Sequence, residues 1–472
     1  TNQNQFPVPV VPIGACMVAE ATQQAGHDVT LLDLMFEKDP VKLIRKEISR
    51  LKPDVVGFSV RNIDNNDIQD PAFFIRELLP LLMKTVRDMT QAPIVLGGAA
   101  VPVMPEELLR YTGATCAVTG GGETVFPLLI ERISEGGQIR DVPGVAWIEK
   151  GEYTRNSSAL HSSECSCMAP DFRRWINIRA YLTRQSTIPI QTKLGCRFSC
   201  VYCTYRKIEG DRYRLCSPDE VLEAVSGLAA RGFRSIEFVD NVFNCPYEHG
   251  FEVCEKLAAA RPMASFQSLE LSPLYLDDAL VSVMEKAGFK GIGITLESAS
   301  DRVLDGLGKG FTSSHVHRAA EIIRRHDLRC FWMFMLGGPN ETEETVKETL
   351  RFAERFIRPQ DVAYFAMGIR IYPGTEIESI ARQQGILSLS PAEMLEPVFY
   401  LSPDLDFGWL RHQVGQSMEK HMNFMSSASL GLPIIRPLQK LGYRLGLRAP
   451  LWTYTRLLRN GLRAMGMDKR LS

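Results

Sequence analysis

Short apolar runs alternate with amphipathic segments along most of the chain. In the first 140 residues these runs resemble buried strands, and the apolar residues between them recur at helical spacing. We expect strands at 28–34, 54–60, 92–98 and 116–123. We expect helices at 14–26, 40–51 and 71–88, after Pro105, and over the sequence VFPLLIERI. This order predicts an α/β fold with a doubly wound, Rossmann-like parallel sheet, whose ligand crevice lies at the carboxyl ends of the strands.

A second alternating series begins after a polar stretch. Its expected strands lie near 187–194, 234–240, 264–271, 290–297, 329–337 and 362–371. Its expected helices lie at about 217–232, 247–260, 276–287, 313–326 and 341–357. Six βα units predict a partial (βα)6 barrel, with its chemistry at the C-terminal ends of the strands.

The segments outside the two series set the predicted domain boundaries. The sequence GVAWIEKGEYTR (144–155) predicts a hairpin that turns at Lys150 and Gly151, and we place it in a linker. The stretch after residue 385 has helical patterns and no β series. The chain opens on a loop-like stretch without a preceding strand, so we expect residues before Thr1. The predicted parts are a domain at 1–140, a linker at 141–186, the barrel at 187–385 and a helical segment at 386–472.

Composition narrows the class of protein. The 472 residues carry a formal net charge of -1, so bulk charge gives no reason to expect a nucleic-acid partner. Eleven cysteines are too few for a disulfide scaffold at this length, which favours a reducing, cytoplasmic location. The chain has no run of eighteen apolar residues and no signal-peptide pattern, so we expect it neither to span a membrane nor to be exported.

Three cysteines crowd the sequence KLGCRFSCVYCTY (193–205), just after the first barrel strand. Cys196, Cys200 and Cys203 have no fourth cysteine nearby in the sequence. A [4Fe–4S] cluster takes thiolate ligands, and three of them leave one iron open to an exchangeable ligand. Zinc and a purely structural loop are the alternatives. A zinc site more often has four ligands or includes histidine, and no histidine lies between 162 and 248.

The spacing C-x3-C-x-aromatic-C, with Tyr202 before the last cysteine, resembles the motif of radical S-adenosylmethionine (SAM) enzymes. The resemblance implies that the open iron chelates the amino and carboxylate groups of SAM, which is cleaved to a 5′-deoxyadenosyl radical. Later strand ends resemble the family's other motifs, in the sequences FVDNVFN, GIGITLESAS, MLGGPNET and RIYPGTE. The residues expected at SAM are Tyr202, Asp240, Asn241, Glu270, Glu297 and Ser298, with Gly337 and Gly338 near adenine.

The N-terminal series resembles the cobalamin-binding domain fused upstream of many radical SAM enzymes, and the alternative is a generic flavodoxin-like or nucleotide-binding sheet. Small residues along one edge of a parallel sheet leave room for a flat corrinoid. The D-x-H-x-x-G motif that supplies an axial histidine in other cobalamin domains is absent. Arg61 or Asn62 is expected to face cobalt, and an ordinary turn role is the alternative. The expected cobalamin contacts are Ser59, Arg61, Asn62, Gly97, Gly98, Gly120, Gly121, Gly122 and Glu123.

The C-terminal segment is basic, with nine Lys or Arg residues against Asp468 across 431–472. Arg456, Arg459 and Arg463 share one face at helical spacing. An apolar stripe is expected from Leu451, Tyr454, Leu458, Leu462 and Met465. Two interpretations stay open: a helix docked on the barrel with solvated arginines, and an interfacial helix that contacts anionic lipid.

Together the resemblances cover residues 1 to about 385 and imply a cobalamin-dependent radical SAM enzyme, most commonly a methyltransferase acting on an unactivated carbon. They imply a [4Fe–4S] cluster, SAM and cobalamin as cofactors, and an external electron donor such as flavodoxin or ferredoxin. The substrate is expected to be a small or lipid-like molecule. The alternatives are polar methylation, an oxidation, cyclisation or ring contraction without methyl transfer, an active barrel beside an empty N-terminal domain, and a cobalamin-binding sensor or carrier. No general base is evident.

Overall fold

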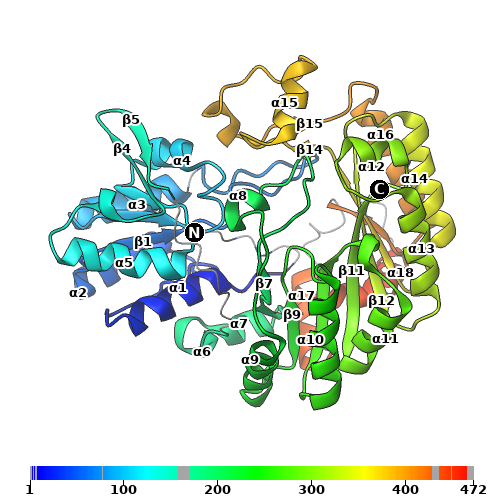
Figure 1. Cartoon of the computed structure of the whole chain (residues 1–472), viewed down its shortest axis with the longest axis horizontal. Coiled ribbons are helices and arrows are strands. Elements are labelled where there is room, and N and C mark those ends of the chain that lie inside the picture. Colours follow the sequence, from blue (N-terminus) through cyan, green and yellow to red (C-terminus); the bar gives the residue numbers. More distant parts are fainter. Residues whose placement is uncertain are drawn as a thin grey trace.

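The predicted βα units form two sheets, which lie beside each other in Figure 1. The structure is a computed structural model that describes residues 3, 5, 8–76, 78–157, 167, 169–427, 435–447 and 449–464. The N-terminal unit occupies the left of the view and the barrel the right. Within the described parts of the chain, no helix is both long and apolar enough to cross a membrane.

Three parallel strands form the centre of the N-terminal sheet, in the order β1 (Val56–Ser59), β2 (Ile94–Gly97) and β3 (Cys116–Val118). Their apolar side chains are largely buried, as expected for strands covered by helices. The helices are α1 (Ile13–Gln24), α2 (Pro40–Leu51), α3 (Leu78–Met89), α4 (Pro105–Thr112) and α5 (Gly122–Ser134). The predicted α/β character of this unit is confirmed.

The strand expected at 28–34 is wrong. These residues, all of them described, pair with no strand. Side chains satisfy the polar groups of the segment instead. The Gln3 side-chain amide donates to the Leu34 carbonyl at 2.7 Å, and the Tyr181 hydroxyl donates to the Asp33 carboxylate at 2.9 Å. Because Tyr181 lies in the connection before the barrel, the segment joins the two units rather than extending the sheet.

The hairpin predicted at 144–155 is confirmed, but it does not lie in a linker. Strands β4 (Val145–Glu149) and β5 (Glu152–Arg155) add antiparallel to β3, so the sheet order is β1-β2-β3-β4-β5. Val145 and Trp147 are buried in a core shared with β2, β3 and α5. That burial explains why the hairpin stays with the N-terminal unit.

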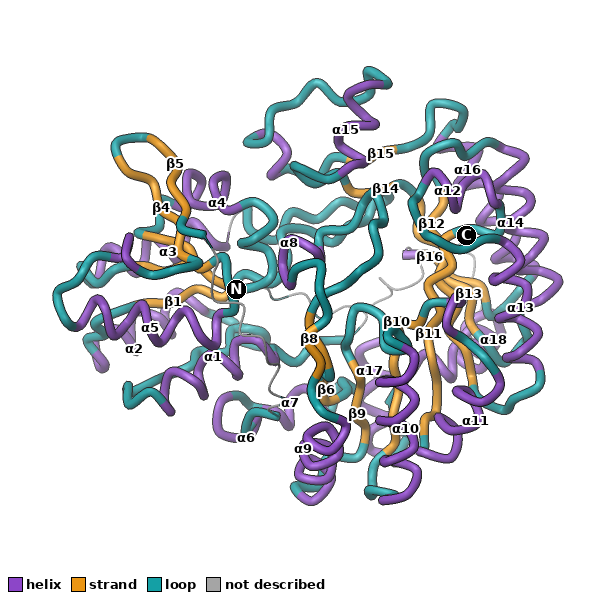
Figure 2. The backbone as a smooth tube through the Cα atoms, viewed as in Figure 1, coloured by secondary structure: helices purple, strands orange, loops and turns teal. Residues whose placement is uncertain are grey.

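All six predicted barrel strands are present, and a seventh strand adds to them. The sheet runs β6 (Ile188–Ile190), β9 (Ser235–Phe238), β10 (Ser265–Leu271), β11 (Phe289–Glu297), β12 (Arg329–Leu336), β13 (Val362–Met367) and β16 (Phe424–Ser426), all parallel. Its outer helices are α9 (Pro218–Ala230), α10 (Tyr247–Ala260), α11 (Asp278–Ala287), α13 (Ser313–Arg324) and α14 (Glu343–Phe356). Figure 2 shows these helices outside the curved row of strands.

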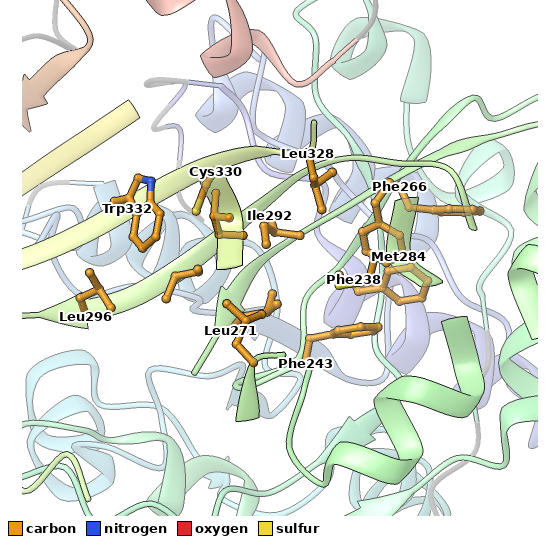
Figure 3. Close-up of a cluster of buried hydrophobic side chains, with 14 of the residues drawn as sticks. Phe238, Phe243, Phe266, Leu271, Met284, Ile292, Leu296, Leu328, Cys330 and Trp332 are labelled. Atoms are coloured by element: carbon orange, nitrogen blue, oxygen red, sulfur yellow. The ribbon is translucent and has the colours of Figure 1, made fainter. Parts of the chain in front are cut away.

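Alternation along β12 separates the two faces of the barrel sheet. Cys330, Trp332, Phe334 and Leu336 are fully buried, whereas the intervening residues are half-buried. Figure 3 shows Cys330 and Trp332 with Ile292, Leu296 and Met284 in the core beneath the outer helices. The half-buried residues therefore belong to the inner, concave face, where a substrate has access.

The C-terminal segment was expected to be helical, and this is only partly right. Helix α15 (Glu376–Gln383) lies just before it, and the segment itself contains α16 (Phe407–Lys420), α17 (Ile435–Arg444) and α18 (Thr455–Ala464). It also supplies β16 and the short β15 (Phe399–Tyr400), which pairs with β14 (Ile369–Arg370). These strands have two or three residues, too few to show a period in the sequence.

The arginines of α18 are not uniformly solvated, which corrects the first interpretation of that helix. Arg459 is buried and donates to the carbonyls of Phe424, in β16, and Met418, near the end of α16. Arg463 donates to the Glu419 carbonyl at 3.0 Å, and Arg456 is exposed. Cations at a helix C-terminus satisfy its free carbonyls, so these arginines fasten α18 to α16. Met465, from the predicted stripe, lies outside the described residues.

Candidate active site

The carboxyl ends of the two sheets meet through the loop that follows β1. Asp64 in this loop forms a buried ion pair with Arg370, just beyond β13, with 2.7 Å between Oδ2 and Nε. Tyr372 donates its hydroxyl to the Asn66 side chain at 2.8 Å. Figure 1 shows the loop crossing from the N-terminal unit towards β14. Ligands of the two units, which bind at strand ends, therefore face one another.

The cysteine loop lies at the same end of the barrel, between β7 (Lys193–Leu194) and α8 (Tyr205–Glu209). Cys196 is buried, and Cys200 and Cys203 are half-buried. Gly195 has a φ of +90°, and a Cβ there would lie 2.1 Å from the Arg212 carbonyl oxygen, so only glycine permits this approach. The backbone amide of Val201 donates to the Leu307 carbonyl at 3.1 Å, which ties the loop to the barrel.

The donor set fits a cluster better than a single ion. In the described part of the chain, no group of three or more His, Cys, Asp or Glu side chains is gathered around one metal position. A cubane does not need that arrangement, because each thiolate binds a different iron. Zinc, which needs its ligands at one point, fits less well. Cys196, Cys200 and Cys203 are therefore the residues that would hold a [4Fe–4S] cluster.

Asn241 and Asp240 support the cysteine loop. Both oxygens of Asp240 are engaged, by the Thr192 amide and hydroxyl at 2.7 Å each, and the carboxylate is fully buried beside Lys193. Both Asp240 oxygens thus have partners inside the protein, and its predicted SAM contact stays a prediction. The Asn241 side chain donates at 2.6 Å to Glu209, which also accepts from the Gly195 amide at 3.0 Å. Both residues thus position the loop that bears the cysteines.

Glu297 is the strongest candidate for a SAM contact. It ends β11 with a φ of +62°, which is strained for a residue with a side chain and is common at functional sites. Its Oε1 accepts from the Tyr202 hydroxyl at 2.7 Å and pairs with Lys309 Nζ at 2.9 Å. Its Oε2 is buried without a partner. A buried carboxylate oxygen needs a donor, and a bound hydroxyl or amino group would supply it.

Lys309 was not predicted, although it contacts two predicted residues. It pairs with Glu297 and donates to the Tyr202 hydroxyl at 3.2 Å. Burial opposes its charge, but the Glu297 carboxylate outweighs burial and raises the Lys309 pKa. Its sequence signal was weak: a single lysine between Gly308 and Gly310, both with positive φ. The three side chains form a buried polar group directly beside the cysteine loop.

Three other residues predicted near SAM make hydrogen bonds inside the protein. The Ser298 hydroxyl is fully buried and bonds Thr349 at 3.0 Å. The Gly337 and Gly338 amides donate to the buried Glu341 carboxylate, the second of them at 2.9 Å. Burial raises the Glu341 pKa to about 7. The SAM contact of Ser298 and the approach of adenine to Gly337 and Gly338 stay predictions.

Small residues form the predicted cobalamin edge. Ser59 ends β1, Gly97 ends β2, and Gly120 to Gly122 follow β3. A Cβ built on Gly97 would meet no atom within 4 Å, so this strand end borders open space. Gly98 differs, because its φ is +95° and a Cβ would lie 2.5 Å from the Val60 carbonyl oxygen. The glycines thus bring two loops together and leave the edge open, which fits a flat corrinoid.

Arg61 lies beyond this edge. Its side chain is exposed by surface area, yet surrounding protein lowers its pKa. Glu237 on the inner face of the barrel lies near enough for its charge to raise the Arg61 pKa in part. Asn62 is half-buried, and the Glu123 carboxylate lies 3.2 Å from the position a Cβ would take on Gly121. The predicted cobalamin contacts of these residues stay predictions.

Two family models match this chain, one in each of its two units. The family model of the radical SAM superfamily matches residues 190–353, and that of the B12 binding domain matches residues 4–130. The chain is 25% identical over 386 residues to an uncharacterised methyltransferase of Pyrococcus horikoshii, covering 80% of this chain and 79% of that protein. It is 24% identical to the anaerobic magnesium-protoporphyrin IX monomethyl ester cyclase of Rubrivivax gelatinosus, over 92% of this chain and 77% of the cyclase.

A solved structure shares the whole fold. The radical SAM methyltransferase TsrM of Kitasatospora setae, with tryptophan and a SAM analogue bound, has a TM-score of 0.86 at 22% identity. The match covers 99% of this chain and 98% of that one. The order of the two matched domains and the cysteine motif at the barrel end agree with this fold. The chain therefore belongs to the cobalamin-dependent radical SAM enzymes, with an N-terminal B12 binding domain and a radical SAM barrel.

Proposed function

We propose that this enzyme transfers a methyl group to an unactivated carbon of a small organic substrate. The observation that carries the proposal is the buried ion pair of Asp64 and Arg370. It joins the strand ends of the B12 binding domain to the strand ends of the barrel. Both cofactors and the inner face of the barrel then border one interior, as a transfer between them requires.

When bound, SAM and cobalamin supply an adenosyl radical that removes a hydrogen atom and a methyl group that replaces it. The chain's own residues bind and orient the cofactors and the substrate, and they exclude water. Cys196, Cys200 and Cys203 would hold the cluster, while Glu297 and Lys309 would receive polar groups of SAM. The protein's main contribution is position, because a radical reacts with whichever C–H bond it meets first.

The relatives support methylation and leave one competitor. The Pyrococcus relative and TsrM are both named methyltransferases, and TsrM was solved with tryptophan, which supports a compact substrate. The Rubrivivax relative is a cyclase and covers 92% of this chain. Cyclisation without methyl transfer is therefore the second candidate.

The domain boundaries proposed here place the B12 binding domain at residues up to 155, because β5 completes its sheet.

Two partners complete the proposal. Reductive cleavage of SAM needs an electron, so we expect a one-electron donor such as flavodoxin or ferredoxin. We also expect transient contact with anionic membrane through the C-terminal helices, where Leu441, Leu445 and Leu457 are exposed near Arg444 and Arg456. Both partners stay proposals.

The nucleosides released from SAM distinguish the candidates. The reconstituted, reduced enzyme is incubated with trideuteromethyl-labelled SAM and a small-molecule extract of the cells that encode it. Radical methylation gives S-adenosylhomocysteine, 5′-deoxyadenosine and a product that contains the labelled methyl group. Cyclisation or oxidation gives 5′-deoxyadenosine without labelled product, and polar methylation gives S-adenosylhomocysteine alone. If neither nucleoside is released, the result supports a cobalamin-binding sensor or carrier and contradicts the proposal.

A further inference from the structure

The C-terminal segment closes one end of the barrel. A single row of register partners crosses the sheet through Pro189, Glu237, Gln267, Gly291 and Arg329. Residues 449–455 lie across this row. The Arg329 guanidinium donates to the Thr453 carbonyl, and the Ser235 hydroxyl donates to the Ala449 carbonyl at 3.4 Å. Because this row is near the amino ends of the strands, the closed end lies opposite the cofactor edge.

Trp452 projects from this segment onto the inner face. Its indole Nε1 donates to Gln267 Oε1 at 3.2 Å, and its ring meets the edge of Phe331 with centroids 5.5 Å apart. A Cβ built on Gly291 would lie 2.4 Å from the Trp452 ring. A glycine at this point of β11 is therefore required to admit the indole. The buried N–H has its acceptor, which fixes the ring orientation.

The inner face above Trp452 is largely apolar. It comprises Thr295, Phe331, Met333, Met335 and Tyr364, all half-buried in the middle of a seven-stranded sheet. Phe331 and Tyr364 stack with centroids 6.0 Å apart. Residues on the other face of β12 are fully buried by helices, so the remaining exposure of these side chains is towards the barrel interior. Apolar and thioether side chains suit an apolar or aromatic substrate.

The height of this face is limited. Gly291 and Glu297 are six positions apart along β11, about 20 Å at the usual rise of a strand. The indole of Trp452 packs against Gly291 at the lower end of that span, which shortens the part of the face left below the cofactor edge. We infer that Trp452 is the floor of the substrate site and restricts the enzyme to compact, largely apolar substrates. This inference rests on the proposed function, because it takes the inner face as the place where substrate binds.

Two probes of different length test the inference. Equilibrium dialysis measures the affinity of the holoenzyme for naphthalen-2-ol and for the longer 6-phenylnaphthalen-2-ol. The wild type is expected to bind the short probe and to reject the long one. Trp452→Ala removes the floor, so the long probe should bind about tenfold tighter or more, with little change for the short one. Gly291→Ala should act in the opposite direction, because the added methyl pushes the indole upward and weakens binding of the short probe.

Trp409 offers a matched control. It lies on the outer helix α16, where Lys347 sits over its ring at 5.4 Å, so Trp409→Ala should leave both affinities unchanged. If the wild type and Trp452→Ala have the same ratio of affinities for the long and the short probe, the inference is overturned. So would a failure of both probes to bind the wild type, or an equal change in Trp409→Ala. The dialysis does not depend on methyl transfer. If labelled product forms but Trp452→Ala leaves the relative affinity for the two probes unchanged, the role given to Trp452 is contradicted and the proposed function is not. If the relative affinity changes but no labelled product forms, the proposed function is contradicted and the role of Trp452 is not.

Discussion

Asp64 and Arg370, 306 positions apart in the chain, form an ion pair whose side chains are 0% and 2% exposed. Arg370 also donates to the Met394 carbonyl at 2.7 Å, so its guanidinium has a second hydrogen-bond acceptor besides Asp64. The pair connects the loop after β1 of the B12 binding domain with β14, which follows the barrel strand β13. It sets how closely the two cofactor edges approach.

Breaking this pair should loosen the domains. Arg370→Met leaves the Asp64 carboxylate buried and unpaired, at a cost of about 3–5 kcal/mol. We expect a lower thermal midpoint and faster release of bound cobalamin, measured by calorimetry and by the absorbance of the filtrate. The Arg76–Glu396 pair also links the two domains but is half exposed. Arg76→Met should therefore cost at most about 1 kcal/mol. Equal effects of the two substitutions would contradict the role given to Asp64 and Arg370.

The cysteine triplet predicts a selective loss. Cys203→Ala should lose the iron of the cluster and its EPR signal after reduction, yet retain cobalamin, which binds the other domain. Cys245 is the matched control. It is buried, lies near enough to affect the Cys196 thiol electrostatically, and accepts from the Tyr213 hydroxyl at 3.2 Å. Cys245→Ala should keep its iron. Iron loss in this variant would show that a fourth thiolate binds the cluster.

Glu297 should govern SAM affinity. Glu297→Gln preserves size and removes the charge that pairs with Lys309. Loss of a charged hydrogen bond is worth about 1.5–3 kcal/mol, so SAM should bind about tenfold more weakly or worse. Equilibrium dialysis of the reconstituted protein measures this, with iron content as the check that the cluster persists. Glu223→Gln, at an exposed position of α9, should leave the affinity unchanged. Unaltered affinity in Glu297→Gln would exclude the SAM contact.

Glu270 should make stability depend on pH. Burial, followed by the charge of Glu297, raises its pKa to about 8, while Lys309 opposes the shift and Glu237 and Tyr205 also face it. Between the ordinary glutamate pKa of about 4.3 and that value, the folded protein holds a proton that the unfolded chain releases. Stability from this group is therefore full below the lower pKa and is lost as pH rises through about 8.

Thermal midpoints measured from pH 5 to pH 9 test this. Glu270→Gln should lessen the decline with pH that the wild type shows, because glutamine cannot release a proton, while the raised pKa of Glu341 leaves a smaller decline. Glu223→Gln should keep the decline. A wild-type slope that survives in Glu270→Gln would assign it to another group.

Sequence and structure contributed differently to the candidate site. The cysteine spacing is local, so Cys196, Cys200 and Cys203 were predictable from one loop. Glu297 was predictable because it ends a strand in a recognisable series. Asp240 and Ser298 occupy similar strand ends, but only the packed structure shows Thr192 and Thr349 taking their polar atoms. Lys309 reaches the site from a separate loop, and no local pattern marks it.

The sequence by itself determined the two βα series, the cofactor classes and the order of the domains, because period, spacing and motif are properties of neighbouring residues. Tertiary structure alone decided that the segment 28–34 forms no strand, that β16 completes the barrel sheet and that Trp452 enters it. These features depend on partners far apart in the chain: Tyr181 contacts Asp33 across 148 positions, Trp452 contacts Gln267 across 185 positions, and β16 pairs with β13. Contacts of that kind follow from packing, which no short stretch of sequence encodes.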